Sequence, residues 1–515
     1  MTFAGPADSP VSPGRAMHAP TPRAPDAATA RLDRTLLLVL LLGTLASLPL
    51  TVRGFWDARP DAARYLLAAR SLADGQGYTV MGEPFRLRPP GFSTLLAPIV
   101  AGRGFDFPLL NALTSLTGVA AVVLFYVLLL PRTGAWVAFA VALVAWLNPQ
   151  LQALCNQVMS DVPALALALL ALVLARRAEE RPWSLAREAV LLLTLAAGVY
   201  VRTANVLLVP AIVLDRACRH GFADARRRLV LPVAAFALLW LPWLLTPSFT
   251  SQYDSPDLHS YSTAFLRADP NDPDAPALGA ERWQERIADN VSAYASLLAT
   301  GMVSRRPSSV APFVAVLALA ALAFVLARRR EAPEWFALAT CVVIAGYYVA
   351  QARLLLPVYV LAIAALAELL QWCVARVASL RTATAWITAL LLVVALAQRT
   401  GDPRPNARAE HDSLVAATDL VRSGTPPDVA IAGDMGAVYA LLLERPVYSL
   451  RPLSRRGQDA ELARLLDERR IGVIVAEHPG PLDALVEQWR AAGAEVVPLP
   501  HHVVARRPTV SSALR

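Results

Sequence analysis

The sequence contains no lysine, so arginine alone supplies the positive side of its formal net charge of +8. Cysteine is also scarce: the four cysteines lie in or beside apolar runs, and no disulfide framework can be read from them. Charged residues make up 17% of the chain, hydrophobic residues make up 56%, and the mean hydropathy is +0.45. These values indicate a multi-span membrane protein. In such a protein an arginine surplus reports topology, so we expect no nucleic-acid partner.

The N-terminal residues 1–30 are rich in proline and alanine and have no apolar core. We expect them to form a disordered cytoplasmic tail. The apolar run at 35–51 has no small-residue cleavage site at its end, so this region does not read as a cleavable signal peptide.

Apolar runs long enough to cross a bilayer recur over residues 31–399. They predict an α-helical polytopic membrane protein with about eleven spans. The predicted spans are 35–51, 107–131, 134–148, 158–175, 186–200, 203–214, 228–246, 309–328, 332–350, 353–373 and 382–398.

The runs 186–200 and 203–214 could instead form one long span with Arg202 inside it, which would invert the orientation of everything downstream. The connectors 176–187 and 216–228 are both rich in arginine, which favours a cytoplasmic position for both. Two crossings, or a deep re-entrant pair, must then separate them. An odd number of spans places the C-terminal part outside, so we predict a multi-pass plasma (inner) membrane protein.

Three predicted extracytoplasmic segments are too long to be turns. Residues 52–106 follow the first span, and residues 247–308 carry an apolar stripe at helical spacing from Trp283 to Leu298, which suggests a helix on the membrane surface. Residues 400–515 alternate strand-like and helix-like stretches and predict a small soluble α/β domain. That domain has no GxGxxG after a strand, so no dinucleotide site is implied.

Two carboxylates at predicted outer helix starts are candidates for chemistry. Asp61 opens an amphipathic stretch, where it could cap the helix or accept a proton from an incoming hydroxyl, and Asp57 is a neighbouring rival. Asp161 precedes Pro163, an ordinary helix-start pattern taken alone. Because both starts face the predicted outer side, Asp61 and Asp161 could divide acid and base duties or hold a divalent cation.

Four arginines share that predicted outer face. Arg202 and Arg353 stand at outer helix ends, against the positive-inside pattern. Each could be a snorkelling side chain, but a charge at that depth is costly enough that a partner is expected. Together with Arg86 and Arg88 they could form a basic ring that grips a phosphate through paired hydrogen bonds.

Four stretches taken in order resemble the GT-C superfamily of membrane glycosyltransferases, in particular bacterial proteins akin to aminoarabinose transferases and protein O-mannosyltransferases. They are "DAARYLLAARSLADGQGY", "RLRPPGF", "SDVPALALALLAL" and "RLLLPVYVLAI", and the resemblance covers roughly residues 30–400. It implies that Asp61 is the catalytic base or electrostatic centre and that Asp161 is a second acidic residue of the site. It also implies functional roles for Arg88 and Arg353.

Two positions depart from the family pattern. Leu354 stands where an aromatic residue is usual, and Leu87 stands where some relatives carry an acidic residue. The second departure bears on any metal site, for which Asp61 and Asp161 are the only candidates, and no cofactor is otherwise implied.

The resemblance implies a sugar donor on a polyprenyl phosphate, with the lipid phosphate as leaving group stabilised by arginines. The acceptor would be a cell-envelope glycan, lipid or protein. Membrane lipid is a further expected partner, and transfer would take place at the extracytoplasmic face. A lipid-linked glycan polymerase or ligase is the nearest alternative function. A secondary transporter ranks lower, because it would place charges near the midplane and show internal symmetry.

Overall fold

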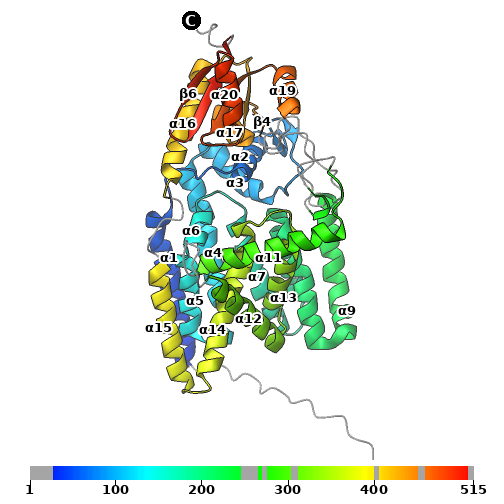
Figure 1. Ribbon diagram of the computed structural model, residues 1–515. Helices are drawn as coiled ribbons and strands as arrows, with labels where there is room; N and C mark the ends of the chain where they lie inside the picture. The colour runs from blue at the N-terminus through cyan, green and yellow to red at the C-terminus, as the bar shows by residue number, and fades with distance from the viewer. Residues whose placement is uncertain are drawn as a thin grey trace, which may run out of the picture.

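The computed structural model describes residues 27–244, 265–268, 275–302, 311–398, 405–450 and 459–508. Figure 1 shows a bundle of helices with a smaller sheet-containing unit at one end. The predicted N-terminal tail and much of the predicted loop 247–308 lie outside the described residues.

Every predicted span coincides with helix. The helices are α1 (Ala27–Thr51), α4 (Phe107–Thr133), α5 (Ala135–Leu147), α7 (Asp161–Glu179), α8 (Leu185–Val201), α9 (Leu208–Leu244), α12 (Ala311–Arg329), α13 (Ala332–Gly346), α14 (Leu356–Val374) and α15 (Leu380–Gln398). Two predicted spans fall in α9, which is kinked at Gly221 (φ 73°). Within the described residues, four helices are long and apolar enough to cross a membrane, or five if the bent pair of α5 and α6 (Pro149–Cys155) counts as one span. The chain is thus a membrane protein, and the number eleven stays a prediction.

The chain reverses direction at Arg202, so the two runs before and after it are two helices. Arg202 has extended backbone (φ −155°, ψ 120°) and is followed by the 3-10 helix η1 (Thr203–Leu207). Near the far end of α8, Arg216 of α9 grips Glu188 with two hydrogen bonds of 2.8 and 3.1 Å. Because these residues lie on helices that run in opposite directions, both basic connectors come to the same end of the bundle.

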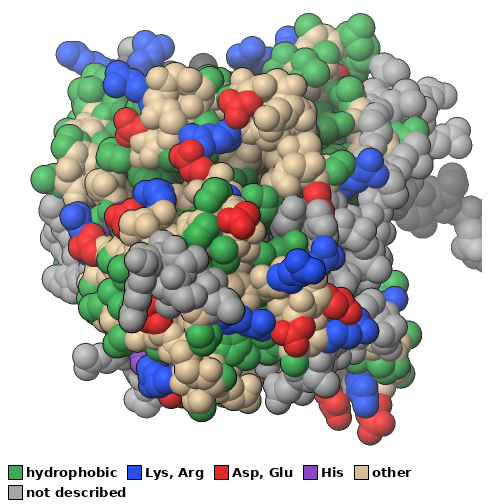
Figure 2. Space-filling model, turned by 90° about the horizontal axis from the view of Figure 1, so that it is seen from above, with side chains coloured by type: hydrophobic (Ala, Val, Ile, Leu, Met, Phe, Trp, Pro, Cys, Tyr) green, Lys and Arg blue, Asp and Glu red, His purple; other side chains and the backbone are tan. Residues whose placement is uncertain are grey.

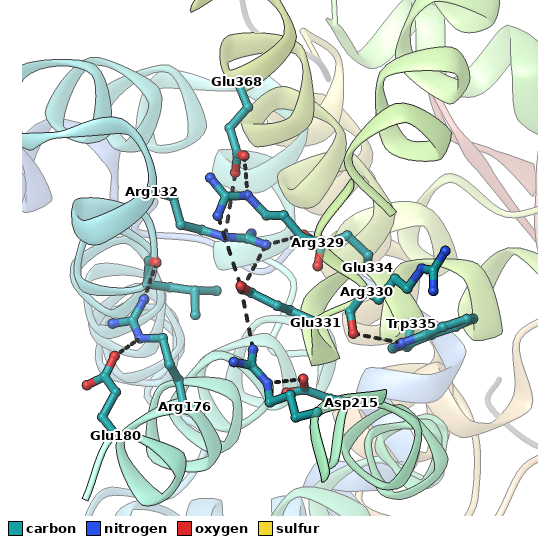
Figure 3. Close-up of polar contacts among 12 residues, drawn as sticks. Arg132, Arg176, Glu180, Asp215, Arg329, Arg330, Glu331, Glu334, Trp335 and Glu368 are labelled. Atoms are coloured by element: carbon teal, nitrogen blue, oxygen red, sulfur yellow. Dashed lines mark hydrogen bonds and ion pairs between the residues drawn. The ribbon is translucent and has the colours of Figure 1, made fainter. Parts of the chain in front are cut away.

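An ion cluster ties the helices together at that end (Figure 3). Arg132, at the end of α4, is 5% exposed and lies 2.5 Å from Glu334, 3.1 Å from Glu331 and 3.6 Å from Glu368. Arg329 contacts the same Glu368 at 2.6 Å. We call these five residues the Arg132 cluster. It joins α4, α12, α13 and α14.

The length of helix α7 gives the distance between the two polar ends of the bundle. This helix runs from Asp161 to Glu179 over 19 residues, which correspond to about 27 Å at 1.5 Å per residue. That length is close to the hydrocarbon thickness of a bilayer, about 30 Å. The two ends therefore lie about one bilayer core apart.

The segment after α1 forms a platform at the end opposite the Arg132 cluster. It contains α2 (Pro60–Ala73), the short antiparallel strands β1 (Thr79–Val80) and β2 (Glu83–Pro84), and α3 (Gly91–Arg103). Helix α11 (Ala280–Met302) crosses the bundle near this level (Figure 1). Tyr294 and Leu298 of its predicted apolar stripe are buried in the protein, whereas Ile287 and Val291 are exposed.

The C-terminal residues form a five-stranded sheet in the order β4-β3-β5-β7-β6. Strands β4, β3 and β5 are parallel, β7 runs antiparallel to its neighbour β5, and the edge strand β6 runs antiparallel to β7. The elements are α16 (Ala407–Gly424), β3 (Ala430–Gly433), α17 (Gly436–Leu443), β4 (Tyr448–Ser449), α19 (Asp459–Glu468), β5 (Ile471–Glu477), α20 (Asp483–Ala491), β6 (Glu495–Pro498) and β7 (His502–Arg506). Figure 2 shows acidic side chains and arginines interspersed over this end of the molecule, as on a surface in water.

The sheet unit packs directly on the platform. Helix α17 contacts α2, and one apolar core contains Trp56, Tyr65 and Leu66 together with Val438 and Tyr439. Burial of these large side chains is the main stabilising contribution to the contact. The C-terminal unit therefore fixes the position of α2, the helix that carries Asp61.

Removing the Arg132 guanidinium should destabilise the bundle. Arg132→Gln leaves three glutamates close together with less compensation, and breaking a buried charge pair costs about 3–5 kcal/mol. We expect a clear fall in the thermal unfolding midpoint of the purified protein in detergent. Arg408→Gln is the control, because Arg408 pairs with Asp412 on the exposed face of α16 and such pairs contribute about 0–1 kcal/mol. Equal midpoints for the two variants would contradict a stabilising role for the cluster.

Candidate active site

Asp61 lies at the centre of a set of arginines from distant parts of the chain. Arg88 Nη2 donates to both carboxylate oxygens at 2.9 and 3.0 Å, and Arg353 Nη1 lies 2.8 Å from Oδ2. Arg64, one turn along α2, approaches Oδ1 at 3.4 Å. The backbone cap of α2 is Arg59, and Asp61 follows at the second helical position. Asp61 therefore serves as an ion-pair partner, and the capping alternative does not apply.

These contacts control the ionisation of Asp61. Burial by itself raises the pKa of this carboxyl group, but the guanidinium groups of Arg88, Arg353 and Arg64 outweigh burial and hold its pKa well below the usual range. Asp61 is therefore charged at physiological pH. While the arginines remain in contact, it is also a weaker base than an ordinary aspartate.

Asp161 belongs to a second pair beside the first. Its side chain is 2% exposed, and Arg202 Nη2 lies 3.0 Å from Oδ1. The N–H groups of Arg202 are not aligned for a hydrogen bond to Asp161. Both Asp161 oxygens therefore accept no hydrogen bond from the described residues. Arg202 Nη1 donates to Ser160 Oγ at 3.2 Å, and that hydroxyl lies 3.1 Å from the Tyr65 hydroxyl on α2. This chain of contacts connects the start of α7 to the helix of Asp61.

Arg353 is oriented by the elements around it. It lies in the 3-10 helix η2 (Ala352–Leu355), and its Nε donates to Gln351 Oε1 at 2.7 Å. The backbone N–H of Gln351 donates to the Tyr294 hydroxyl of α11 at 3.3 Å. Helix α11 thus supports the residue that holds Arg353.

A glycine allows the segment after Arg88 to pack against the end of α8. A Cβ atom on Gly91 would lie 2.6 Å from the carbonyl oxygen of Tyr200 and 2.9 Å from the backbone nitrogen of Val201. Only glycine permits this approach without a backbone shift. The contact brings the start of α3 next to Arg202.

Two predicted residues stand apart from these pairs. Arg86 is exposed and makes no hydrogen bond or ion pair with the part of the chain that the structure describes, so its role in phosphate binding stays a prediction. Asp57 is buried, and Gln157 Nε2 donates to it at 3.0 Å. Asp57 therefore connects the loop before α2 to the loop before α7.

The site carries a surplus of positive charge. Among the residues that the structure describes, Arg64, Arg88, Arg202 and Arg353 face two aspartates, a formal charge of +2. Divalent cations prefer several free carboxylate oxygens, but the Asp61 oxygens are taken by guanidinium groups, and no group of three or more metal-ligating side chains occurs in the described ranges. The described side chains around Asp61 do not supply the set of oxygen ligands that a divalent metal ion prefers. They fit an anion.

Sequence reasoning missed three residues of the site. Arg64 had a detectable signal, because residues three apart on a helix are neighbours. Nothing in the local sequence indicates that Ser160 contacts Arg202 or that Gln351 orients Arg353. Asp61, Asp161, Arg88, Arg202 and Arg353 are all brought together as ion-paired residues.

The fold resembles those of solved structures of ArnT and of the archaeal oligosaccharyltransferase AglB. Among solved structures, ArnT from Cupriavidus metallidurans in the apo state matches with a TM-score of 0.59 and 12% identity, over 94% of this chain and 99% of that chain. The same protein bound to undecaprenyl phosphate matches with a TM-score of 0.57 and 12% identity, over 93% and 98% of the two chains.

The archaeal oligosaccharyltransferase AglB from Archaeoglobus fulgidus is also similar. Its complex with an inhibitory peptide and a dolichol-phosphate matches with a TM-score of 0.53 and 12% identity, over 88% of this chain and 70% of that chain. No protein-family model matches the sequence, and no curated protein matches it. The likeness is therefore one of fold.

Proposed function

We propose that this chain is an integral-membrane glycosyltransferase that moves a sugar from a polyprenyl-phosphate donor to a cell-envelope glycan, lipid or protein. The observation that carries the proposal is the contact of Asp61 with Arg88 and Arg353 in a site of net positive charge. Similar folds in ArnT bound to undecaprenyl phosphate and AglB with a dolichol-phosphate support a lipid phosphate as the anion.

The donor phosphate is an alternative partner for the arginines on Asp61. Guanidinium groups bind phosphate and carboxylate with the same paired geometry. A phosphate that engages Arg88 and Arg353 withdraws them from Asp61, and the pKa of the carboxyl group then rises towards its ordinary value. Donor binding would thus turn an inert carboxylate into a stronger base.

The transfer step then follows from these positions. The acceptor hydroxyl oxygen forms a bond to the anomeric carbon while the bond from that carbon to the phosphate oxygen breaks. The bonding electrons leave with the phosphate, and the hydroxyl proton passes to Asp61. Arg88, Arg202 and Arg353 stabilise the negative charge that grows on the leaving phosphate.

Asp161 is suited to orienting a substrate. Its two buried oxygens accept no hydrogen bond from the described residues, and such groups are costly unless a donor reaches them. Hydroxyl groups of the sugar or the acceptor would supply those donors. Asp161 would therefore position substrate while Asp61 takes the proton.

The distribution of charge argues against a secondary transporter. Transporters place coupling charges near the bilayer midplane, whereas the ion pairs here occur at the two ends of α7. A lipid-linked glycan polymerase or ligase would use the same donor chemistry and would differ in its acceptor.

The proposal places the site and the C-terminal unit on the extracytoplasmic face of the plasma membrane. The arginine-rich connectors should then be cytoplasmic. Reporter fusions after Arg228 should give a cytoplasmic signal, and fusions at residue 400 should give an extracytoplasmic signal. A cytoplasmic signal at residue 400 would contradict the proposed orientation.

Loss of the Asp61 charge should abolish transfer. Asp61→Asn keeps the size of the side chain but removes the base, and we expect turnover to fall by about 10²–10⁴-fold. Asp61→Glu, which keeps the charge and shifts the carboxylate by one methylene, should also be impaired while remaining folded. Asp412→Asn, on the exposed face of α16, is the control. Near-normal turnover of folded Asp61→Asn in membranes would assign the base elsewhere, with Asp57 the next candidate.

Replacing Arg353 by lysine should be damaging although the charge is retained. An ammonium group cannot reproduce a planar paired contact, so Arg353→Lys should weaken donor binding and lower turnover. Arg381→Lys is the matched control, because Arg381 is exposed at the other end of the bundle. Sugar transfer from a synthetic polyprenyl-phosphate donor measures both variants. Equal activity of the two would show that Arg353 is only a membrane-interface anchor.

A further inference from the structure

A groove beside α1 is separate from the residues of the proposed reaction. Its volume is about 700 Å³, within the range of small-molecule sites, about 300–1,000 Å³. Three parts of the chain line it: the second half of α1 from residue 39 with residues 52 and 53 after it, residues 139–147 of α5, and α6 with Asn156 after it.

The break between α5 and α6 creates the space. Pro149 cannot continue α5, and α6 leaves at an angle of 58°. The bend therefore leaves space between this half of α1, the end of α5 and α6. A Cβ atom on Gly43 would meet nothing within 4 Å, which shows that the groove is open at the middle of α1.

The middle of the groove is lined mainly by apolar side chains, and its polar groups are paired within the protein. The hydroxyls of Thr44 and Ser47 donate to carbonyl groups of α1 itself, and Trp146 Nε1 donates to Ser47 Oγ. These polar atoms need no ligand. Leu50, which lines the groove, is 77% exposed, and Leu42, outside it, is 55% exposed, as expected for side chains in contact with lipid.

The outer mouth of the groove is polar and carries positive charge. Arg53 lines it, and its backbone N–H donates to Asn156 Oδ1 at 2.7 Å, which fixes the residue there. Gln152 also lines the mouth, and its buried Oε1 accepts no hydrogen bond from a described residue. An arginine above a mainly apolar groove matches a phosphate above a hydrocarbon chain.

We propose that this groove binds one acyl chain of an anionic glycerophospholipid whose phosphate contacts Arg53. The chain fills the space that the break after α5 leaves and completes the packing of α1. This site would stabilise the bundle and is independent of the donor site around Asp61.

Photo-crosslinking of the delipidated, full-length protein in detergent tests the proposal. The probes are phosphatidylglycerol and phosphatidylcholine with the same diazirine on one acyl chain. We expect phosphatidylglycerol to label residues 35–53 and 139–156 about fivefold more than phosphatidylcholine, the ratio implied by about 1 kcal/mol per arginine near an anionic lipid. Arg53→Gln should bring that ratio close to one, measured on the intact protein.

Filling the groove supplies the matched variants. Gly43→Trp should lower labelling of residues 35–53 several-fold with both lipids. Gly43→Leu should give a smaller decrease, and it replaces Gly43→Trp in the test where the tryptophan variant does not fold. Leu45→Trp is the control, because Leu45 lies on an exposed face of α1 outside the groove. The proposal would be overturned if all faces of α1 were labelled equally and Gly43→Trp did not change that labelling. Displacement of the phosphatidylglycerol probe by equimolar undecaprenyl phosphate would also overturn it, and would identify a prenyl chain as the occupant.

Discussion

A charge among apolar helices is stable only when an opposite charge compensates it, and this constraint governs both ends of the bundle. At one end Asp61 and Asp161 are paired with arginines, and at the other end Arg132 lies among glutamates. The two ends differ in their balance. The Arg132 cluster has three glutamates against two arginines, whereas the site around Asp61 has four arginines against two aspartates. Counted over the described residues, the site around Asp61 has two excess positive charges, which suits an anionic ligand, and the Arg132 cluster has one excess negative charge.

The same pairing explains how the site can remain folded without substrate. Four arginines close together would repel one another, and Asp61 holds two of them through short contacts. A donor phosphate would replace one anion by another at these arginines, so the charge balance would change little. Exchange of a carboxylate for a phosphate therefore connects the stability of the resting site to the proposed reaction.

Elements far apart in the chain hold this arrangement. The sheet unit packs on α2 through α17, and α11 supports the residue that orients Arg353. Gly91 permits the close contact between α3 and the end of α8. The groove beside α1 lies outside this framework and is lined mainly by apolar side chains, so it suits a different class of ligand.

Much of the fold was predictable because apolar runs of sufficient length must form helices in a membrane. Each predicted span contains helix, and the reversal at Arg202 follows from the basic connectors on either side. Ion pairing could also be expected from the sequence for a set of charged residues, because charges at this depth of a membrane protein require partners. These residues are Asp61, Asp161, Arg88, Arg202 and Arg353.

The partners themselves were decided only by the tertiary structure. Arg86 and Arg88 stand two residues apart, so an extended chain would place both on one face. The segment after β2 is irregular, and Arg88 alone reaches Asp61 while Arg86 is exposed. Arg353 reaches the same carboxylate from 292 positions away, a contact that no local pattern encodes. Sequence periodicity determines which residues form helices, because that depends on neighbours along the chain, whereas pairing depends on how those helices pack.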